Sequence, residues 1–323
     1  MECVYGIVKG KIMIINAGMR TDIPGYYSEW FYNRIKEGFV CVRNPYYPEQ
    51  VTRYKLSPAF VDCLAFCTKN PEPMIDRLDE IRDFNQFWFV TITPYGKEIE
   101  PFVPDKMKVI ESFKKLSEKV GKNAISWRYD PIFITDKYSV DFHIDAFEKM
   151  AENLCGYVDN CVISFIDLYQ KTKRNFPKAK EVTREERWQL GQAFARIGEK
   201  YGIKIRSCCE GTELAIFGVD ISGCMTKNII ERAIGSALEV PKSRKSAREE
   251  CDCLIGSDVG VYNTCGHGCV YCYANYDRET VINNMKLHNP KSPFLIGDMR
   301  EGDVVHDAKQ EAWSNGQMML FFE

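Results

Sequence analysis

Residues 124–131 read Ala-Ile-Ser-Trp-Arg-Tyr-Asp-Pro, an apolar run that ends in charged residues and a proline. This pattern predicts a strand over Ala124–Tyr129 that is buried on both faces, as strands of parallel sheets are. The helical pattern Pro104–Val120 precedes it and stops at Gly121, and a second helical pattern, Val140–Tyr157, follows it. A buried strand between two helices is typical of βαβ units with parallel strands.

The same alternation extends over the first two-thirds of the chain and predicts an α/β fold. We expect a (β/α) barrel, complete or partial, over residues 1–240, with a cysteine-rich cluster-binding segment and tail at 241–323 packed on it. A doubly wound open sheet is the alternative, but the even repeat and the lack of a Gly-rich fingerprint after the first strand favour the barrel. The other predicted strands are Lys11–Ala17, Phe39–Arg43, Asp62–Thr68, Phe87–Thr93, Cys161–Ile166 and Ile203–Cys208, and the other predicted helices are Ser28–Lys36, Pro73–Asp83 and Thr183–Tyr201.

Composition narrows the function classes. Lys and Arg number 43 and Asp and Glu number 45 among 323 residues, so the formal charge is −2. So balanced a chain is not expected to bind nucleic acid in bulk through its phosphates. No apolar run reaches the ~18 residues of a membrane helix, and the N-terminus does not resemble a signal peptide. The sequence therefore predicts a cytoplasmic protein without a membrane partner.

Polar side chains are predicted where the strands end. In α/β folds the carboxyl ends of parallel strands meet at one edge, where ligands bind. Any one of these residues could simply cap a helix or pair with a neighbour, but together they predict a pocket for a small polar molecule. They are Asn16, Arg20, Asp22, Arg43, Asn44, Thr93, Arg128, Asp130, Asp167, Cys208, Cys209 and Glu210.

Fourteen cysteines are many for a chain without an export signal. Cys41, Cys63, Cys67, Cys155 and Cys161 lie in apolar stretches and are predicted core residues. Apart from Cys3, the remaining cysteines all lie between residues 208 and 272. Whether a second metal centre forms there is left open by the sequence, and its candidate ligands are Cys208, Cys209, Cys224, Cys251 and Cys253.

Residues 265–272 read Cys-Gly-His-Gly-Cys-Val-Tyr-Cys and carry the strongest signal. Glycines let the loop wrap closely, so the thiolates of Cys265, Cys269 and Cys272 can converge on one metal centre. Three thiolates on a [4Fe–4S] cube leave one iron open, whereas a structural zinc site requires four ligands. His267 is the residue that could complete such a zinc site, which would make the segment a non-catalytic binding module.

The Cys-x3-Cys-x2-Cys spacing with Tyr271 before the last cysteine resembles the radical SAM superfamily, although here the motif stands late in the chain. The resemblance implies that the three cysteines hold a [4Fe–4S] cluster and that S-adenosylmethionine binds its open iron, with Tyr271 near the adenine. It further implies an external electron donor of the flavodoxin or ferredoxin type, and a 5′-deoxyadenosyl radical that takes hydrogen from the substrate.

A wider resemblance covers nearly the whole chain. Residues 248–253, 258–265 and 271–275, together with 20–24 and 127–131, are similar to the family of uncharacterised domains numbered 1848. Arg128-Tyr129-Asp130-Pro131 also resembles spore photoproduct lyases, which keeps a radical lyase acting on a DNA lesion as an alternative. The family resemblance brings to mind lyases that cut the cyclopentenediol from the modified base queuine.

Acidic side chains on the predicted rim suit the N–H edge of a purine-like base. The best prediction from the sequence is therefore a radical lyase acting on free queuine. The predicted roles are catalysis for Asp130, Glu210 and Arg128, cofactor binding for Tyr271, Arg43 and Asn16, and substrate binding for Asp22, Asp167 and Arg20.

Overall fold

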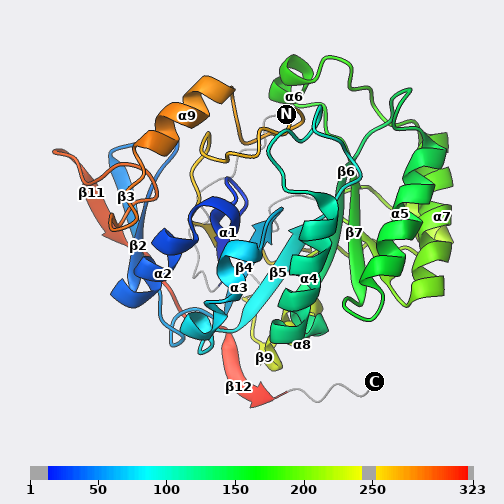
Figure 1. The fold of residues 1–323 in the computed structure, drawn as a ribbon. Helices are drawn as coiled ribbons and strands as arrows, with labels where there is room; N and C mark the ends of the chain where they lie inside the picture. Colours follow the sequence, from blue (N-terminus) through cyan, green and yellow to red (C-terminus); the bar gives the residue numbers. More distant parts are fainter. Residues whose placement is uncertain (1–13, 242–251, 319–323) are drawn as a thin grey trace.

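The computed structural model describes residues 14–241 and 252–318, and its centre is a parallel sheet (Figure 1). The strand order is β10-β1-β4-β5-β6-β7-β8, and every neighbouring pair is parallel. From β1 to β8 the order follows the chain in one direction. The bounds are β1 Ile14–Ala17, β4 Cys63–Thr68, β5 Gln86–Thr91, β6 Ile125–Ile132, β7 Asn160–Phe165, β8 Lys204–Ser207 and β10 Ser257–Asp258.

Helices cover one face of this sheet, as right-handed crossovers that always advance in one direction require. In Figure 1, α4 lies along β5, while α5 and α7 pack together beyond β7. The bounds are α1 Ile23–Tyr26, α2 Ser28–Glu37, α3 Glu72–Ile75, α4 Lys106–Val120, α5 Val140–Leu154, α6 Gln170–Asn175, α7 Arg184–Tyr201, α8 Lys227–Ile234 and α9 Arg278–Lys286.

Side chains alternate along each strand and build two separate cores. Phe66, Trp88 and Trp127 belong to the larger core, which includes the helices that cover that face. Ala65 and Phe89 point the other way, into a smaller core that α8 helps to fill. Arg128 and Asp130 alternate with Trp127 and Tyr129, so they belong to the face of the smaller core.

The predicted parallel α/β sheet is confirmed, but a barrel is not shown. Within the described residues the edge strands β10 and β8 pair with one neighbour each, and not with one another. The prediction that Phe39–Arg43 is a strand of this sheet is wrong. That segment, β2, pairs with β3 (Gln50–Lys55) in a separate sheet that β11 (Val304–Asp307) completes.

Local signals were reliable at several helix ends. The capping box of Thr183 and Glu186 opens α7, and Gly202 ends it in the left-handed conformation. The single helix predicted over Pro73–Asp83 is instead α3 followed by a 3₁₀ turn, Leu78–Ile81. Cys155 is exposed rather than part of the core, because it stands just beyond the end of α5.

The C-terminal part of the chain pairs with strands that come earlier in the sequence. β10 adds an edge to the main sheet beside β1, and β12 (Ser314–Met318) pairs with β9 (Ser236–Leu238). The start of the first predicted strand, residues 11–13, and Cys251 lie outside the described residues. None of the helices described is both long and apolar enough to cross a bilayer.

Candidate functional site

Two groups of residues occupy the carboxyl ends of the strands, and the first lies on the face of the smaller core. β6 brings Arg128 and Asp130 there, and the Arg128 guanidinium donates a hydrogen bond to the Asp130 carboxylate. Ser164 of β7 donates to the other oxygen of Asp130. Burial lowers the pKa of Arg128, but the charge of Asp130 and neighbouring thiols raise it well above its ordinary value. The arginine is a permanent cation in this site.

Buried donors without a partner mark the same region. Asn16 is 5% exposed, and its Nδ2 finds no hydrogen-bond acceptor among the described residues. Arg128 Nε is also buried and has no hydrogen-bond acceptor among the described residues. Buried polar atoms are nearly always satisfied in folded proteins, so each exception calls for an explanation such as a ligand. Asn16 and Arg128 therefore each present a buried donor to which an acceptor of a bound molecule would bind.

Glu210 lies after β8 with its side chain mostly buried. The Phe165 backbone N–H donates to one of its oxygens at 2.8 Å, and Arg187 donates to the other at 3.0 Å. Burial raises the pKa of Glu210 to about 8, against the lowering effects of the Phe165 hydrogen bond and of the Arg187 charge. At neutral pH the carboxyl group is largely protonated, so it is able to donate a proton.

Three other predicted site residues are tied to protein partners. Arg20 binds Asp258 of β10, its Nε lying 2.6 Å from Oδ2. Arg43 lies in the separate sheet, where it pairs with Asp303. Asp167 accepts a hydrogen bond from the Tyr169 hydroxyl at 2.7 Å. The strand-end position predicted for Arg43 is wrong, because β2 is not a strand of the main sheet.

The second group surrounds the loop of Cys265, Cys269 and Cys272. Backbone hydrogen bonds join this loop to the segment after β5, from Val270 N to Ile99 O at 3.0 Å and from Phe102 N to His267 O at 3.1 Å. Arg278 of α9 donates to the carbonyl of Gly266 at 2.9 Å. The cysteine loop is thus held against the carboxyl end of the sheet, a position that the motif itself did not predict.

His267 connects the loop to other parts of the chain through both of its ring nitrogens. Its Nε2 lies 2.7 Å from Asp22 Oδ2, and its Nδ1 lies 3.3 Å from the Tyr26 hydroxyl. Asp22 also accepts from the backbone N–H groups of Lys69 and Gly25, both at 2.8 Å. Both ring nitrogens are engaged, which argues against the alternative of a zinc site completed by His267. Asp22, for which substrate binding was predicted, is hydrogen-bonded to the loop through His267.

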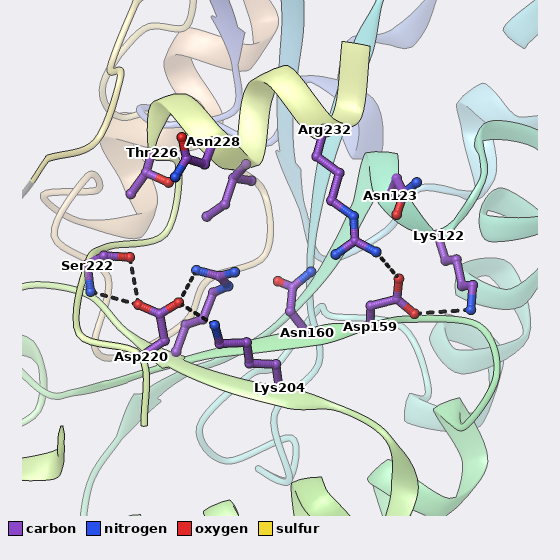
Figure 2. A pocket seen from close by; sticks show the side chains of 12 residues that line it. Lys122, Asn123, Asp159, Asn160, Lys204, Asp220, Ser222, Thr226, Asn228 and Arg232 are labelled. Carbon is purple, nitrogen blue, oxygen red and sulfur yellow. Dashed lines mark hydrogen bonds and ion pairs between the residues drawn. The ribbon is translucent and has the colours of Figure 1, made fainter. Parts of the chain in front are cut away.

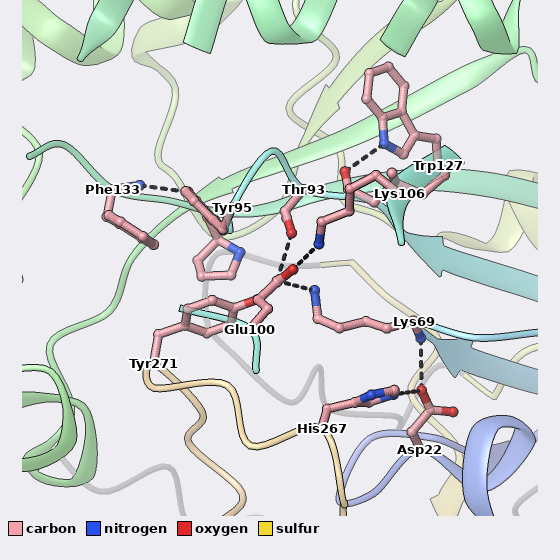
Figure 3. Close-up of polar contacts among 12 residues, drawn as sticks. Asp22, Lys69, Thr93, Tyr95, Glu100, Lys106, Trp127, Phe133, His267 and Tyr271 are labelled. Atoms are coloured by element: carbon pink, nitrogen blue, oxygen red, sulfur yellow. Dashed lines mark hydrogen bonds and ion pairs between the residues drawn. The ribbon is translucent and has the colours of Figure 1, made fainter. Parts of the chain in front are cut away.

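Glu100 is the centre of a buried polar network beside the loop (Figure 3). Its carboxylate is 1% exposed and accepts from Lys69 at 2.8 Å and from Thr93 at 2.7 Å, as well as from Lys106 and the Tyr271 hydroxyl. Burial alone would raise the pKa of Glu100, but the two lysines hold it at about 2. Lys69, Glu100 and Lys106 were not singled out by the sequence, because nothing local links residues so far apart.

The thiols of the loop are half-buried. Burial raises the pKa of Cys269 to about 12 even though the charge of Lys69 lowers it. Burial also raises the pKa of Cys265, and the charges of Asp22, Cys272 and Cys269 add to the effect. In the described chain, just one group of three or more Cys, His, Asp or Glu has all its ligand atoms within 4.8 Å, namely Cys208, Cys224 and Cys253. The three loop cysteines do not form such a group.

A cavity of about 390 Å³ lies at the opposite end of the sheet (Figure 2). Residues before or at the start of β6, β7 and β8 line it, together with α8. Its charges largely satisfy one another: Asp159 pairs with Lys122 and Arg232, and Asp220 pairs with Lys204 and Arg206. Because chemistry in α/β folds collects at the carboxyl ends of strands, we place the candidate site at the other end.

Comparison with known proteins assigns a family without a known activity. Residues 14–274 match the family described as "Domain of unknown function (DUF1848)". The chain belongs to this family. No curated protein matches it.

One solved structure is weakly similar. It is described as a "putative alpha-L-fucosidase from Bacteroides thetaiotaomicron VPI-5482", with 17% sequence identity and a TM-score of 0.26. The match covers 43% of this chain and 42% of that one. So low a score carries no argument about fold or activity.

Proposed function

We propose that this chain is a radical SAM enzyme in which Cys265, Cys269 and Cys272 hold a [4Fe–4S] cluster. The observation that supports the proposal is the loop itself: three half-buried thiols in eight residues, at the carboxyl ends of parallel strands, that do not form a group with all ligand atoms within 4.8 Å. Each thiolate of such a cube binds a different iron, so the sulfurs need not lie that close together. The open iron is the position that S-adenosylmethionine would take.

The backbone of the loop is suited to wrap closely around a metal centre. Gly268 has φ +67°, in the left-handed region that favours glycine. A Cβ at Gly266 would lie 2.5 Å from the Tyr26 ring, so the chain has no room for a side chain there. When bound, the cluster and S-adenosylmethionine together supply a carbon-centred radical that removes a hydrogen atom from the substrate.

The residues of this chain bind the substrate, orient it and exclude water. Asn16 Nδ2 and Arg128 Nε are buried donors without a hydrogen-bond partner among the described residues, so acceptors of a polar molecule would satisfy them. Asp130 is a carboxylate held in place by Arg128 and Ser164, and such a group can accept from the N–H edge of a base. Glu210, protonated at neutral pH, offers a proton to a leaving nitrogen.

The substrate that we propose is queuine, as a free base rather than in a polynucleotide. The formal charge of −2 disfavours bulk contacts with phosphates. Hydrogen-atom removal next to a ring hydroxyl would be followed by loss of the neighbouring amine, which takes a proton from Glu210 while the hydroxyl loses one. The aminomethyl-deazaguanine is then released, and the ring fragment is left with a ketone and an unpaired electron, which one electron from the external donor and one proton would quench. The polar residues around Arg128 suit a base with several donors and acceptors, and the resemblance to queuine lyases points in the same direction.

The test is an anaerobic assay on the whole chain. Reconstituted protein is expected to contain about four irons and four sulfides in the loop site. With S-adenosylmethionine, a strong reductant and queuine, it should form 5′-deoxyadenosine and the deazaguanine product, both measured by mass spectrometry. Queuine deuterated on the cyclopentenediol ring should transfer deuterium to 5′-deoxyadenosine.

Two results would separate errors of class from errors of substrate. Formation of 5′-deoxyadenosine at the same slow rate with and without queuine would reject the substrate but keep the radical chemistry. Zinc without iron or sulfide in the loop after reconstitution would reject the class. Cys155→Ala, an exposed cysteine beyond the end of α5, is the control that should retain both cluster and activity.

A further inference from the structure

A second group of cysteines comes together from three separate parts of the chain. Cys208 follows β8, Cys224 precedes α8, and Cys253 precedes β10. The three sulfurs all lie within 4.8 Å of one another. The Cys208 and Cys253 sulfurs are 3.8 Å apart, and those of Cys224 and Cys253 are 3.5 Å apart.

This spacing matches thiolates on a single ion. Zinc binds cysteine sulfur at about 2.3 Å, and tetrahedral angles then place neighbouring sulfurs about 3.8 Å apart. A disulfide would bring two sulfurs to about 2.05 Å, which neither measured pair approaches. We propose that Cys208, Cys224 and Cys253 form a binding site for one soft divalent cation of the zinc class, distinct from the centre held by the loop.

The backbone around Cys253 is arranged for a thiolate. The N–H groups of Cys224 and Met225 both point at its sulfur, at 3.2 and 3.3 Å. The N–H of Leu254 donates to the carbonyl of Met225 at 2.7 Å, which locks the two segments together. Hydrogen bonds of this kind orient metal ligands and stabilise their charged form.

The surroundings also balance charge. Three thiolates and one divalent ion carry a net charge of −1, and the Arg128 guanidinium interacts with the thiols of Cys208 and Cys224. Met225 and Leu254 close the site with apolar surface, since both belong to the smaller core. A buried anionic centre beside a permanent cation is the arrangement that desolvated charges require.

The described residues supply three ligands to this site. Cys209 follows Cys208 directly, and the two sulfurs are 3.9 Å apart, but Cys209 is not among the three mutually close sulfurs. Bound at this position, an ion would fasten the end of β8 to the segment that leads into β10. Because the cysteine loop follows β10 in the chain, the ion would stabilise the base of that loop.

The experiment separates the two centres by removing the first. In full-length protein with Cys265, Cys269 and Cys272 all replaced by serine, purified without metal under anaerobic reducing conditions, one equivalent of Zn²⁺ is expected to bind. Alkylation followed by mass spectrometry should show that Zn²⁺ protects Cys208, Cys224 and Cys253, while Cys155 reacts equally with and without the metal. Co²⁺ in place of Zn²⁺ should give thiolate-to-metal charge-transfer absorption.

Adding Cys253→Ser to the triple variant should reduce bound zinc to near zero, whereas adding Cys155→Ser should leave one equivalent. The protection assay needs no change at the second site, so it remains decisive if Cys253→Ser prevents folding. Failure of Zn²⁺ to protect these three cysteines would overturn the proposal, and so would uptake of iron with sulfide at this site. Neither result depends on whether the loop carries a cluster or on which substrate it serves.

Discussion

The chain contains two cysteine triads that differ in every respect except their ligand type. Cys265, Cys269 and Cys272 come from eight consecutive residues, but they do not form a group with all sulfurs within 4.8 Å. Cys208, Cys224 and Cys253 are up to 45 residues apart in the chain, yet their sulfurs lie within 4.8 Å of one another. The triad that is compact in sequence is therefore not the one that is compact in space.

The difference teaches that sequence spacing and sulfur spacing report separate properties. A compact motif guarantees only that the thiolates lie in one loop, whereas the distance between sulfurs selects between a cube and a single ion. The groups that surround the two triads also differ. Charged and polar side chains, Asp22, His267 and Glu100, surround the loop, whereas backbone N–H groups and apolar side chains surround the second triad.

The largest expected effect is that of Cys269→Ala. It removes one of the three ligands of the loop centre, so we expect loss of iron and sulfide and of all 5′-deoxyadenosine formation. Zinc at the second triad should be unchanged, and the fold should remain, because β1 to β8 do not depend on the loop. Metal analysis and far-ultraviolet circular dichroism check this. Simultaneous loss of iron and zinc would show that the two centres are one cooperative unit.

Next in size is Glu100→Gln, which tests the electrostatic support of the loop. The substitution leaves Lys69 and Lys106 buried without their carboxylate, and breaking such a pair costs about 3–5 kcal/mol. Urea unfolding of the protein should show this loss. The matched control is Glu111→Gln, an exposed partner of Lys114, for which a change below about 0.5 kcal/mol is expected. Equal effects in the two variants would contradict a structural role for the Glu100 network.

The sequence predicted those structural features that depend on neighbouring residues in the chain. Strand positions, the helix start at Thr183 and the helix end at Gly202 depend on neighbouring residues, and all are confirmed. The sheet to which a strand belongs depends on distant partners. Cys41 of β2 is buried against Phe294 and Val51, so an apolar pattern was not enough to exclude β2 from the main sheet.

The residues of the candidate site likewise divide into those that a local motif reveals and those that only the fold brings together. The cysteine loop could be found because its ligands share one motif. The second triad has no motif, and its members come together only because β8 and β10 lie in one fold. Glu100 and Lys69 are 31 residues apart and became visible as a pair only in the structure. Asp22 was predicted as a substrate-binding residue, whereas its contact with His267, 245 residues away, became visible only in the structure.

The pH dependence of the unfolding free energy tests a buried histidine, His143, that lies near the cysteine loop. His143 Nε2 donates to the Phe133 carbonyl at 3.0 Å, and its Nδ1 lies 2.8 Å from the Tyr129 hydroxyl. The Phe133 ring lies 6.2 Å from that of Tyr271. Burial lowers the pKa of His143 to about 4, from 6.5. The unfolded chain therefore binds more protons between pH 6.5 and 4, and stability falls on acidification through this window by about 3 kcal/mol.

His143→Gln should reduce the stability at pH 7 and also flatten this part of the pH dependence, measured by urea unfolding from pH 7.5 to 4. An unchanged slope in the variant would mean that other groups cause the acid sensitivity.

The smallest expected effect concerns the fit of the loop against α1. Gly266→Ala would place a Cβ 2.5 Å from the Tyr26 ring, and overpacking of this kind costs about 1–3 kcal/mol. Tyr26→Leu removes the ring edge, so Gly266→Ala should cost less in that background than in the wild-type chain. A double-mutant cycle of unfolding free energies measures the coupling. Additive costs would show that the loop avoids Tyr26 by moving, whereas strong coupling with zinc content unchanged would show that α1 positions the first triad without reaching the second.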